Sequence, residues 1–545
     1  MPRAGALITS TRPRAQESSA TARSPRSAAP LRHARTGALV GLLLSVALIA
    51  ISFLGWRAAG LPFAPFDVFD WVVRLLPGPV VTAAIDTSVA ISRMFGVTSI
   101  GAAAKAGDQV LAIAALLTTG VVAGGALFAL LSLSGEPALL FGGILGVMVG
   151  VVALVAERQL QRLPPGSVVP GGWVFLTFMA WGLAFGWAHD RLRTSHFATT
   201  EDTGDTEDVQ GRHNRRRFLA ALAGASGLIS ATSTLAGILV GRIGRRRQGR
   251  RWSDDHVLPN ADAVVLPVPG TRAEFTPVER FYRIDTDTRA PSIDGDRWRL
   301  SIGGLVDQPL TLTLAELRAV EPIELFATLC CISNPPGGDL ISTTRWTGVS
   351  LQRLLPRLSL HPSATHLKIV SADGFFESLA LDAVRRDERI MLAYAWDGAP
   401  LPLEHGYPLR LYVPDLYGMK QPKWIVGLDA IERWEPGYWV QRGWSKDGRV
   451  STMSAVDVAS RSGEGSVDAG GIAFAGARGV SKIEVRLDDQ QWRDAEIRQP
   501  LSDICWVIWR AMLPAGGAEH VVTVRAFDAD GTAQPGPLHS RRTSH

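Results

Sequence analysis

Four apolar runs without any charged side chain occupy the first half of this 545-residue chain. They are Gly37–Trp56, Gln109–Gly135, Pro137–Val155 and Leu163–Ala188. About 20 apolar residues are enough for a helix to cross the hydrocarbon layer of a membrane. Such a chain is not expected to fold as one water-soluble globule. We therefore predict a four-helix membrane region over residues 37–188, with membrane lipid as its surroundings.

Charged residues interrupt the stretch Arg57–Asp108, which predicts an interfacial or exposed segment rather than a further span. The interrupting residues are Asp67, Asp70, Arg74, Asp86, Arg93 and Lys105. Glycine pairs at 124–125 and 142–143 predict close helix contacts. No histidine occurs from Gly37 to Ala188, so imidazole ligands for a haem between these helices are missing. An anchor or assembly role is the simplest interpretation of this region.

The middle of the chain carries the sequence Asn214-Arg-Arg-Arg-Phe-Leu219, followed by an uncharged run to Gly241. This resembles a twin-arginine export signal; the alternative is ordinary cytoplasmic arginines flanking a fifth helix. Both interpretations give a fifth membrane helix over 217–241 after a cytoplasmic linker over 189–216. Both also place everything downstream on the extracytoplasmic side of the cytoplasmic membrane. The arginines of a second linker, over 242–272, oppose this by the positive-inside rule, but long domains can override loop charge.

The second half has another pattern, of short alternating stretches separated by Gly, Pro and Asp turns. Strands are predicted at Trp298–Ile302, Glu324–Leu329, His366–Val370 and Leu409–Val413, and helices at Leu314–Val320 and Ser350–Leu358. The sequence therefore predicts an α+β domain over 273–452. Further strands at Gly471–Ala477, Lys482–Leu487, Trp506–Met512 and His520–Phe527 predict an immunoglobulin-like β-sandwich over 453–545. The remaining segment, 1–36, is basic and without apolar periodicity, and is expected to be a disordered tail.

Two adjacent cysteines, Cys330 and Cys331, stand where a predicted strand runs into a loop of two prolines and two glycines. Neighbouring residues of a strand face opposite sides, so the two thiols should not share a role. A thiolate is the soft ligand that a thiophilic metal prefers. A lone cysteine is more often a small buried apolar residue. The spacing by itself leaves both interpretations open.

Four blocks around this corner resemble, in the same order, the molybdopterin domain of the sulfite oxidase family. They are Phe281–Thr286, Thr328–Asn334, Thr344–Val349 and a long block through Asp397–Pro402, His405–Arg410 and Lys420–Trp424. The resemblance covers about Phe281 to Trp444 and continues more weakly to the end of the chain. It implies a sulfite oxidase-like fold, a molybdenum-molybdopterin cofactor, and an oxidoreductase.

The resemblance also implies roles for single residues. Cys331 matches the cysteine that ligates molybdenum, and Cys330 is expected to be a packed neighbour. The residues that match cofactor contacts are Tyr282, Arg283, Ile284, Ser371, Asp373, His405, Arg410, Gln421, Pro422 and Lys423. Arg283 and Arg345 are candidates to assist an anionic substrate. In this family, a domain like the C-terminal one packs on the cofactor domain and often forms a homodimer.

The family arginine that follows the metal-binding cysteine is missing from Asn334–Gly338, which puts a sulfite substrate in doubt. The prediction is a membrane-anchored enzyme that transfers an oxygen atom with two electrons on a small substrate. The alternatives are a sulfoxide-type reductase with the same cofactor, and a receptor or assembly protein whose cofactor fold is vacant. The electron partner is expected to be a quinone or a redox protein. A net charge of +5 over 545 residues gives no reason to expect nucleic acid.

Overall fold

The computed structural model describes residues 29–94, 100–134, 136–160, 162, 168–197, 206–243, 250–335, 337–462, 465–516 and 519–536. Most of the predicted tail (1–36) and parts of both predicted linkers lie outside these residues. The chain divides into two compact units. The first takes in 1–46, 117–146 and 180–226, and the second takes in 47–116, 147–179 and 227–545. The second unit contains the candidate site.

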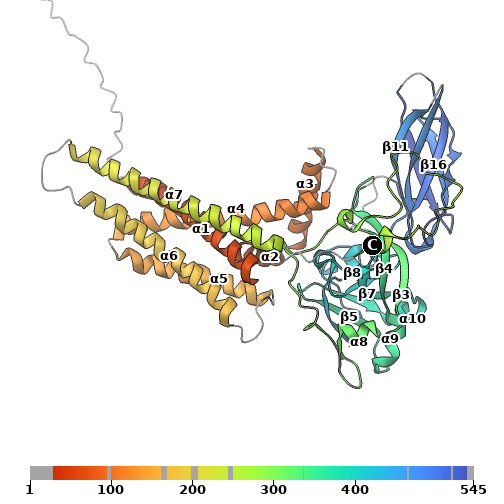
Figure 1. Cartoon of the computed structure of the whole chain (residues 1–545), viewed down its shortest axis with the longest axis horizontal. Coiled ribbons are helices and arrows are strands. Elements are labelled where there is room, and N and C mark those ends of the chain that lie inside the picture. The colour runs from red at the N-terminus through yellow and green to blue at the C-terminus, as the bar shows by residue number, and fades with distance from the viewer. Residues whose placement is uncertain are drawn as a thin grey trace, which may run out of the picture. The chain divides into compact units, whose positions relative to one another are not determined.

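Among the described residues, seven α-helices precede the first strand, and they are labelled in Figure 1. They are α1 (Ala29–Ala59), α2 (Ala64–Leu75), α3 (Gly78–Met94), α4 (Ile100–Ser134), α5 (Ala138–Gln159), α6 (Val168–Phe197) and α7 (Thr206–Ile243). Five of them, among the described residues, are long and apolar enough to cross a membrane: α1, α4, α5, α6 and α7. The described residues of the four predicted runs, apart from Pro137, and the predicted fifth helix lie in these five; Gly135 and 163–167 are outside the described residues. The interrupted stretch forms α2 and α3, which do not meet the length and apolarity of a span.

Small residues let the helices of the first unit approach closely, as the glycine pairs predict. A Cβ atom at Gly124 would collide with the carbonyl oxygen of Gly37, and one at Gly142 with that of Gly182. The helix α6 continues past its predicted end at Ala188 and therefore contains His189. This side chain is buried, with its ring 5.1 Å from that of Phe128.

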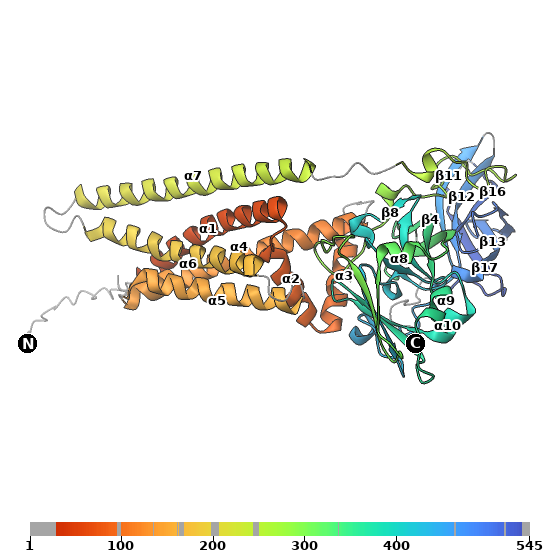
Figure 2. The same cartoon turned by 60° about the horizontal axis from the view of Figure 1, so that its bottom comes forward.

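The residues of the proposed export signal lie inside α7, which is one continuous helix (Figure 2). Arg215 donates a hydrogen bond to Thr36 Oγ1, and the ring of Phe218 lies 5.6 Å from that of Trp187. The linker predicted over 189–216 is accordingly helical over 189–197 and 206–216, because α6 and α7 extend into it. The export signal itself stays a prediction.

Two five-stranded sheets form the α+β domain, as the alternating pattern predicts. Their strands are β1 (Arg299–Gly304), β2 (Leu310–Thr313), β3 (Ile323–Cys330), β4 (Ile341–Ser350), β5 (His366–Ser371), β6 (Phe376–Ala380), β7 (Met391–Trp396), β8 (Ala399–Pro400), β9 (Arg410–Tyr412) and β10 (Ile425–Ile431). One sheet has the order β2-β1-β10-β5-β6, and the other has the order β3-β4-β7-β8 with β9 on β7. Three short helices complete the domain: α8 (Leu314–Arg318), α9 (Leu351–Leu354) and α10 (Leu381–Arg386).

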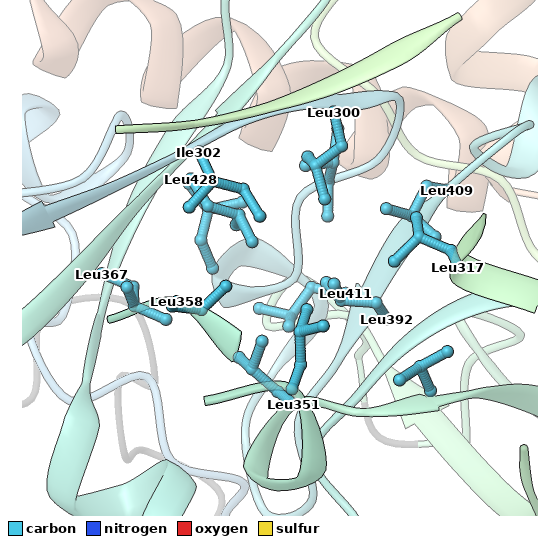
Figure 3. Close-up of a cluster of buried hydrophobic side chains, with 14 of the residues drawn as sticks. Leu300, Ile302, Leu317, Leu351, Leu358, Leu367, Leu392, Leu409, Leu411 and Leu428 are labelled. Carbon is cyan, nitrogen blue, oxygen red and sulfur yellow. The ribbon is translucent and has the colours of Figure 1, made fainter. Parts of the chain in front are cut away.

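The core of this domain positions the site residues through the alternation of β9. Leu409 and Leu411 point into a leucine-rich cluster with side chains from other strands and from the short helices (Figure 3). Arg410 stands between them and must face the other side of the strand. Removing each fully buried leucine side chain from water contributes roughly 1.5–3 kcal/mol to the stability of the fold. The core therefore fixes the strand that presents the buried guanidinium.

The C-terminal residues form two antiparallel sheets (Figure 2). One sheet contains β11 (Met453–Ser462), β12 (Ser466–Phe474), β15 (Glu496–Ile497) and β16 (Val507–Pro514). The other contains β13 (Val480–Leu487), β14 (Arg493–Asp494) and β17 (Val522–Asp528). Trp509, Ile483 and Ala526, from both sheets, share one apolar cluster. The four predicted strands are present, β11, β14 and β15 were not predicted, and the immunoglobulin-like assignment stays a prediction.

Buried ion pairs join α2 to the segment before β1. Asp67 of α2, fully buried, accepts two hydrogen bonds from the Nη2 of Arg289, at 2.9 and 2.8 Å, and pairs with Arg162. Asp70 pairs with Arg162 at 2.9 Å and accepts hydrogen bonds from Thr288. The interpretation of α2 as an exposed segment is therefore wrong at these positions. Its charges are buried because cations from elsewhere in the chain neutralise them.

A second group of ion pairs attaches α4 and the end of α2 to the same segment. Lys105 of α4 pairs with Asp285 at 2.5 Å and donates to the carbonyl of Asp287. Arg74 of α2 pairs with the Asp287 carboxylate. The segment 285–289 is thus bound to two helices that precede it by more than 150 residues.

We predict that Asp67→Asn destabilises the purified full-length protein strongly. The substitution keeps the shape but removes the charge that neutralises Arg162 and Arg289, and breaking a buried pair costs about 3–5 kcal/mol. The midpoint of thermal unfolding in detergent should fall by several degrees. The control is Glu388→Gln, which removes an exposed partner 3.6 Å from Arg353 and should cost less than about 1 kcal/mol. Equal midpoints for the two variants would contradict the buried network.

Candidate active site

Cys331 follows the last residue of β3 at a corner that is closed by hydrogen bonds. Its amide donates to Leu340 O at 2.9 Å, and its carbonyl accepts from Asn334 N at 3.0 Å. The side-chain Oδ1 of Asn334 accepts from Leu340 N at 2.9 Å. The loop therefore returns to β4 as a tight unit, and the Cys331 thiol is held at a fixed strand end.

The two neighbouring thiols face different surroundings, as the alternation of a strand predicts. Cys330 belongs to an apolar cluster with Tyr417, Trp506 and Ile508. Cys331 lines a cavity of about 290 Å³ and contacts Leu340 and Tyr282 there. None of the chain's three cysteines, all of which are described, forms a disulfide. Only one sulfur of the adjacent pair reaches the cavity.

Arg410 supplies a buried positive charge to the same cavity. Its guanidinium lies 5.1 Å from the ring centre of Trp346 and 5.5 Å from that of Trp396. Nη1 donates to His405 O at 3.1 Å, whereas Nε has no hydrogen-bond partner among the described residues. Burial, before any other cause, lowers the pKa of Arg410 to about 10. The guanidinium stays charged and retains a donor for an anionic group.

Lys423 and Arg283 meet at the carboxylate of Asp285. Lys423 Nζ lies 3.3 Å from this carboxylate and donates to the carbonyls of Ile284 and Glu404, and Arg283 Nε donates at 2.8 Å. Burial opposes the charge of Asp285, but Lys423, Lys105 and Arg283 outweigh it and lower its pKa. Burial and the neighbouring arginines lower the pKa of Lys423. One carboxylate faces several cations, so the region has an excess of positive charge.

His405 and Tyr282 are neutral polar groups on the cavity wall. Burial first, and then the charges of Lys423 and Arg410, hold the pKa of His405 well below its usual value. Its ring lies against Trp396, with centres 4.7 Å apart. Burial and the neighbouring thiols raise the pKa of Tyr282, so its phenol keeps its proton. The cavity thus offers an imidazole and a phenol that can hydrogen-bond a heterocycle.

The structure brings most of the predicted residues to this one cavity. The predicted cofactor residues in its wall are Tyr282, Ile284, Cys331, Asp373, His405, Arg410, Gln421, Pro422 and Lys423. Ser371 and Arg283 are outside the described lining, although Ser371 Oγ is buried without a hydrogen-bond partner among the described residues. The amide of Gln421 is bound to the backbone of Val413 and Leu416. Its backbone N–H also donates, to Gly418 O at 3.1 Å, so of Gln421 the backbone carbonyl is the group left to bond a ligand.

Arg345 lies elsewhere. Its guanidinium bonds to Glu324 and stacks 4.9 Å from the ring centre of Trp252. It pairs with Phe326 across β3 and β4, four residues before the Cys330 pair, or about 14 Å along the strand. Arg345 is absent from the described cavity wall. Its predicted role in assisting a substrate therefore has no support from this geometry.

Comparisons with known proteins agree with this geometry. The family model for the oxidoreductase molybdopterin binding domain matches residues 287–439, and that for the Mo-co oxidoreductase dimerisation domain matches residues 449–541. The uncharacterized oxidoreductase YuiH of Bacillus subtilis is 30% identical over 155 residues, which cover 28% of this chain and 76% of the relative. The chain belongs to the molybdopterin-binding oxidoreductase family. It is a molybdenum-dependent oxidoreductase, and its cofactor is molybdenum-molybdopterin.

Other relatives share different fractions of their length with this chain. Human mitochondrial sulfite oxidase is 27% identical over 45% of this chain, which spans about half (54%) of that relative's length. A putative protein-methionine-sulfoxide reductase subunit, YedZ1, of Azospira oryzae is 27% identical over 34% of this chain and 68% of the relative. The sulfane dehydrogenase SoxCD of Paracoccus pantotrophus aligns in structure with a TM-score of 0.45 and 22% identity, over 51% of this chain and 83% of that one.

The chemistry of the cavity fits molybdopterin. A thiolate position at Cys331 suits molybdenum, which is thiophilic. The cofactor ends in a phosphate, which suits the remaining donor of Arg410 and the excess positive charge around Lys423. The neutral His405 and Tyr282 can bond to the pterin edge. These are the residues that would hold the group; the cofactor supplies the two-electron redox chemistry, and the protein holds and tunes it.

Sequence reasoning missed the contribution of the first half of the chain to this cavity. Phe69 and Val73 of α2, Ile85 of α3 and Leu111 of α4 line it. Lys105 of α4 also neutralises Asp285. The signal in the sequence was the set of charged residues that interrupt the stretch Arg57–Asp108. The sequence alone could not connect these residues to partners more than 150 residues away.

Gly406 has φ +110° and separates Arg410 from Lys423, so we predict that Gly406→Ala releases the cofactor. A Cβ there would lie 3.0 Å from Arg410 Cβ and 3.1 Å from Lys423 Cβ, displacing both. Molybdenum and pterin content should fall. The control is Gly531→Ala at φ +77°, where a Cβ meets no described atom within 4 Å. It should cost only the backbone strain of about 1–2 kcal/mol and leave the content unchanged. Full cofactor content in Gly406→Ala would contradict this site.

Proposed function

We propose that this chain is a membrane-anchored molybdopterin oxidoreductase that transfers an oxygen atom, with two electrons, to or from a small substrate. The observation that supports this most directly is the cavity shared by Cys331 and the buried donors of Arg410, His405 and Lys423. A vacant fold would have no need for a buried cation with an unused donor, because such a donor costs free energy unless a ligand bonds to it.

The residues of the cavity have separate tasks in this proposal. Cys331 binds the metal through its thiolate. Arg410 and Lys423 bind the phosphate, and Asp285 keeps Lys423 in place. His405 and the backbone near Gln421 hydrogen-bond the pterin. Tyr282 stays protonated beside the metal ligand and offers a hydroxyl donor to an oxygen atom of the substrate.

The apolar character of the cavity beyond Cys331 favours a neutral substrate over sulfite. No arginine follows the cysteine in the loop, and Arg283 and Arg345 are each bound to a carboxylate. A sulfoxide needs no cation for its recognition. A sulfoxide-type reductase is therefore the second candidate, and a substrate screen with a reduced and an oxidised dye distinguishes the two directions.

The location and the assembly are also part of the proposal. Five apolar helices support membrane anchoring. The basic residues before α1 and those in the first part of α7, Arg212 and Arg215–Arg217, support a catalytic half outside the cytoplasmic membrane. The match of residues 449–541 to a dimerisation domain supports a homodimer.

We predict that Cys331→Ser abolishes molybdenum binding and turnover in protein extracted from membranes. The wild type should contain about one molybdenum per chain, since one thiolate anchors one metal. Metal analysis and a dye-linked substrate assay provide the readout. The control is Cys330→Ala, which removes the neighbouring sulfur from an apolar cluster and should keep both the metal and the activity. The proposal fails if the wild type is active without molybdenum, or if Cys330→Ala loses the metal and Cys331→Ser keeps it.

A further inference from the structure

Part of the cavity lining, called the apolar arm below, is not accounted for by the predicted cofactor residues. Phe69 and Val73 of α2, Val81 and Ile85 of α3 and Leu111 of α4 form its wall. None of these residues offers a polar side chain to a pterin or a phosphate. The arm requires a ligand with a large apolar surface.

Another part of the cavity lining is aromatic and is bonded to α3. Tyr438, Trp439 and Trp444 line the cavity, and the rings of the two tryptophans are stacked with their centres 4.2 Å apart. Trp444 Nε1 donates to Thr82 Oγ1 of α3 at 3.0 Å. Aromatic rings prefer to pack against other rings. The arm is therefore suited to a flat, ring-shaped molecule.

The arm also reaches residues of a candidate membrane span. The apolar span of α4 begins at Ala103, and Ala104 and Leu111 both line the cavity. Asp108 lies between them in the wall, partly exposed, with its carboxylate 3.7 Å from Lys105. A molecule dissolved in the membrane can enter next to α4, where the carboxylate of Asp108 lies in the cavity wall.

We propose that this arm binds a membrane quinone or quinol, which exchanges electrons directly with the active site. This inference rests on the proposed function and names its electron partner. A quinol combines the three properties that the arm selects: a flat ring, an apolar tail and hydroxyl protons. Asp108 accepts a hydroxyl proton of the quinol as it is oxidised.

The reaction balances in both directions. When the substrate XO is reduced, the two O–H bonds of the quinol break and release two electrons and two protons. The X–O bond breaks, and its oxygen leaves with the two protons as water. Quinol and XO give quinone, X and water. The same equation read backwards describes oxidation of X by the quinone, with water as the source of the oxygen atom.

The test is photolabelling of the full-length, detergent-purified protein with an azido-benzoquinone that carries a ten-carbon tail. We expect label on peptides of α2, α3 or Tyr438–Trp444, and we expect excess unreactive decylubiquinone to remove it. Ala84→Phe places a ring in the arm and should reduce this label at least tenfold. The matched control is Ala83→Phe: Ala83 is also exposed on α3 but is not in the described wall, and its label should be unchanged.

Two results would overturn the inference. One is equal labelling of the Ala84→Phe and Ala83→Phe variants, which would place the quinone elsewhere. The other is a wild type that contains molybdenum and turns over with a dye but neither takes up specific label nor reacts with decylubiquinol or decylubiquinone; the proposed function would then stand without this partner. A wild type without molybdenum would instead defeat the proposed function. As a second variant, Asp108→Asn should keep the label and the metal but lower turnover with decylubiquinol at least tenfold.

Discussion

The carboxylate of Asp285 is the point on which the arrangement of this site depends. It pairs with Lys105 of α4 at 2.5 Å, with Arg283 at 2.8 Å and with Lys423 at 3.3 Å. A buried charge is tolerated only when it is paired, and here each partner comes from a different part of the chain. The pairing joins α4, a candidate membrane helix, to the two segments of the cofactor site that contain Arg283 and Lys423. Binding of the cofactor phosphate would then neutralise the remaining positive charge.

This arrangement gives the apolar helices a part in the candidate site as well as a possible role as an anchor. The helices α2, α3 and α4 supply part of the cavity wall. The ion pairs of Asp67 and Arg74 hold α2, and that of Lys105 holds α4, against the segment before β1. An anchor joined by a flexible linker would need none of these contacts. The second compact unit therefore contains both the candidate redox site and part of a candidate membrane helix, and the proposed quinone site follows from that combination.

Much of the site could be predicted from the sequence, because its motifs are local. The strand that ends just before Cys331 and the alternation around Arg410 follow from short patterns and from the family resemblance. Contacts between distant segments could not be predicted. Lys105 reads as an interruption of an apolar run until its partner Asp285 is known. Nothing in the sequence connects Trp444 with Thr82 of α3, to which it donates a hydrogen bond. Arg345 shows the opposite failure: its motif matched, but its strand position directs it to Glu324.

The central claim is that the sulfur of Cys331, and not that of Cys330, is bonded to molybdenum. Molybdenum-edge X-ray absorption on protein extracted from membranes measures the sulfur atoms around the metal directly. The account predicts sulfur scattering from the pterin dithiolene and from one further thiolate, unchanged in a Cys330→Ala preparation. A spectrum that shows only the dithiolene sulfurs in the wild type would contradict it.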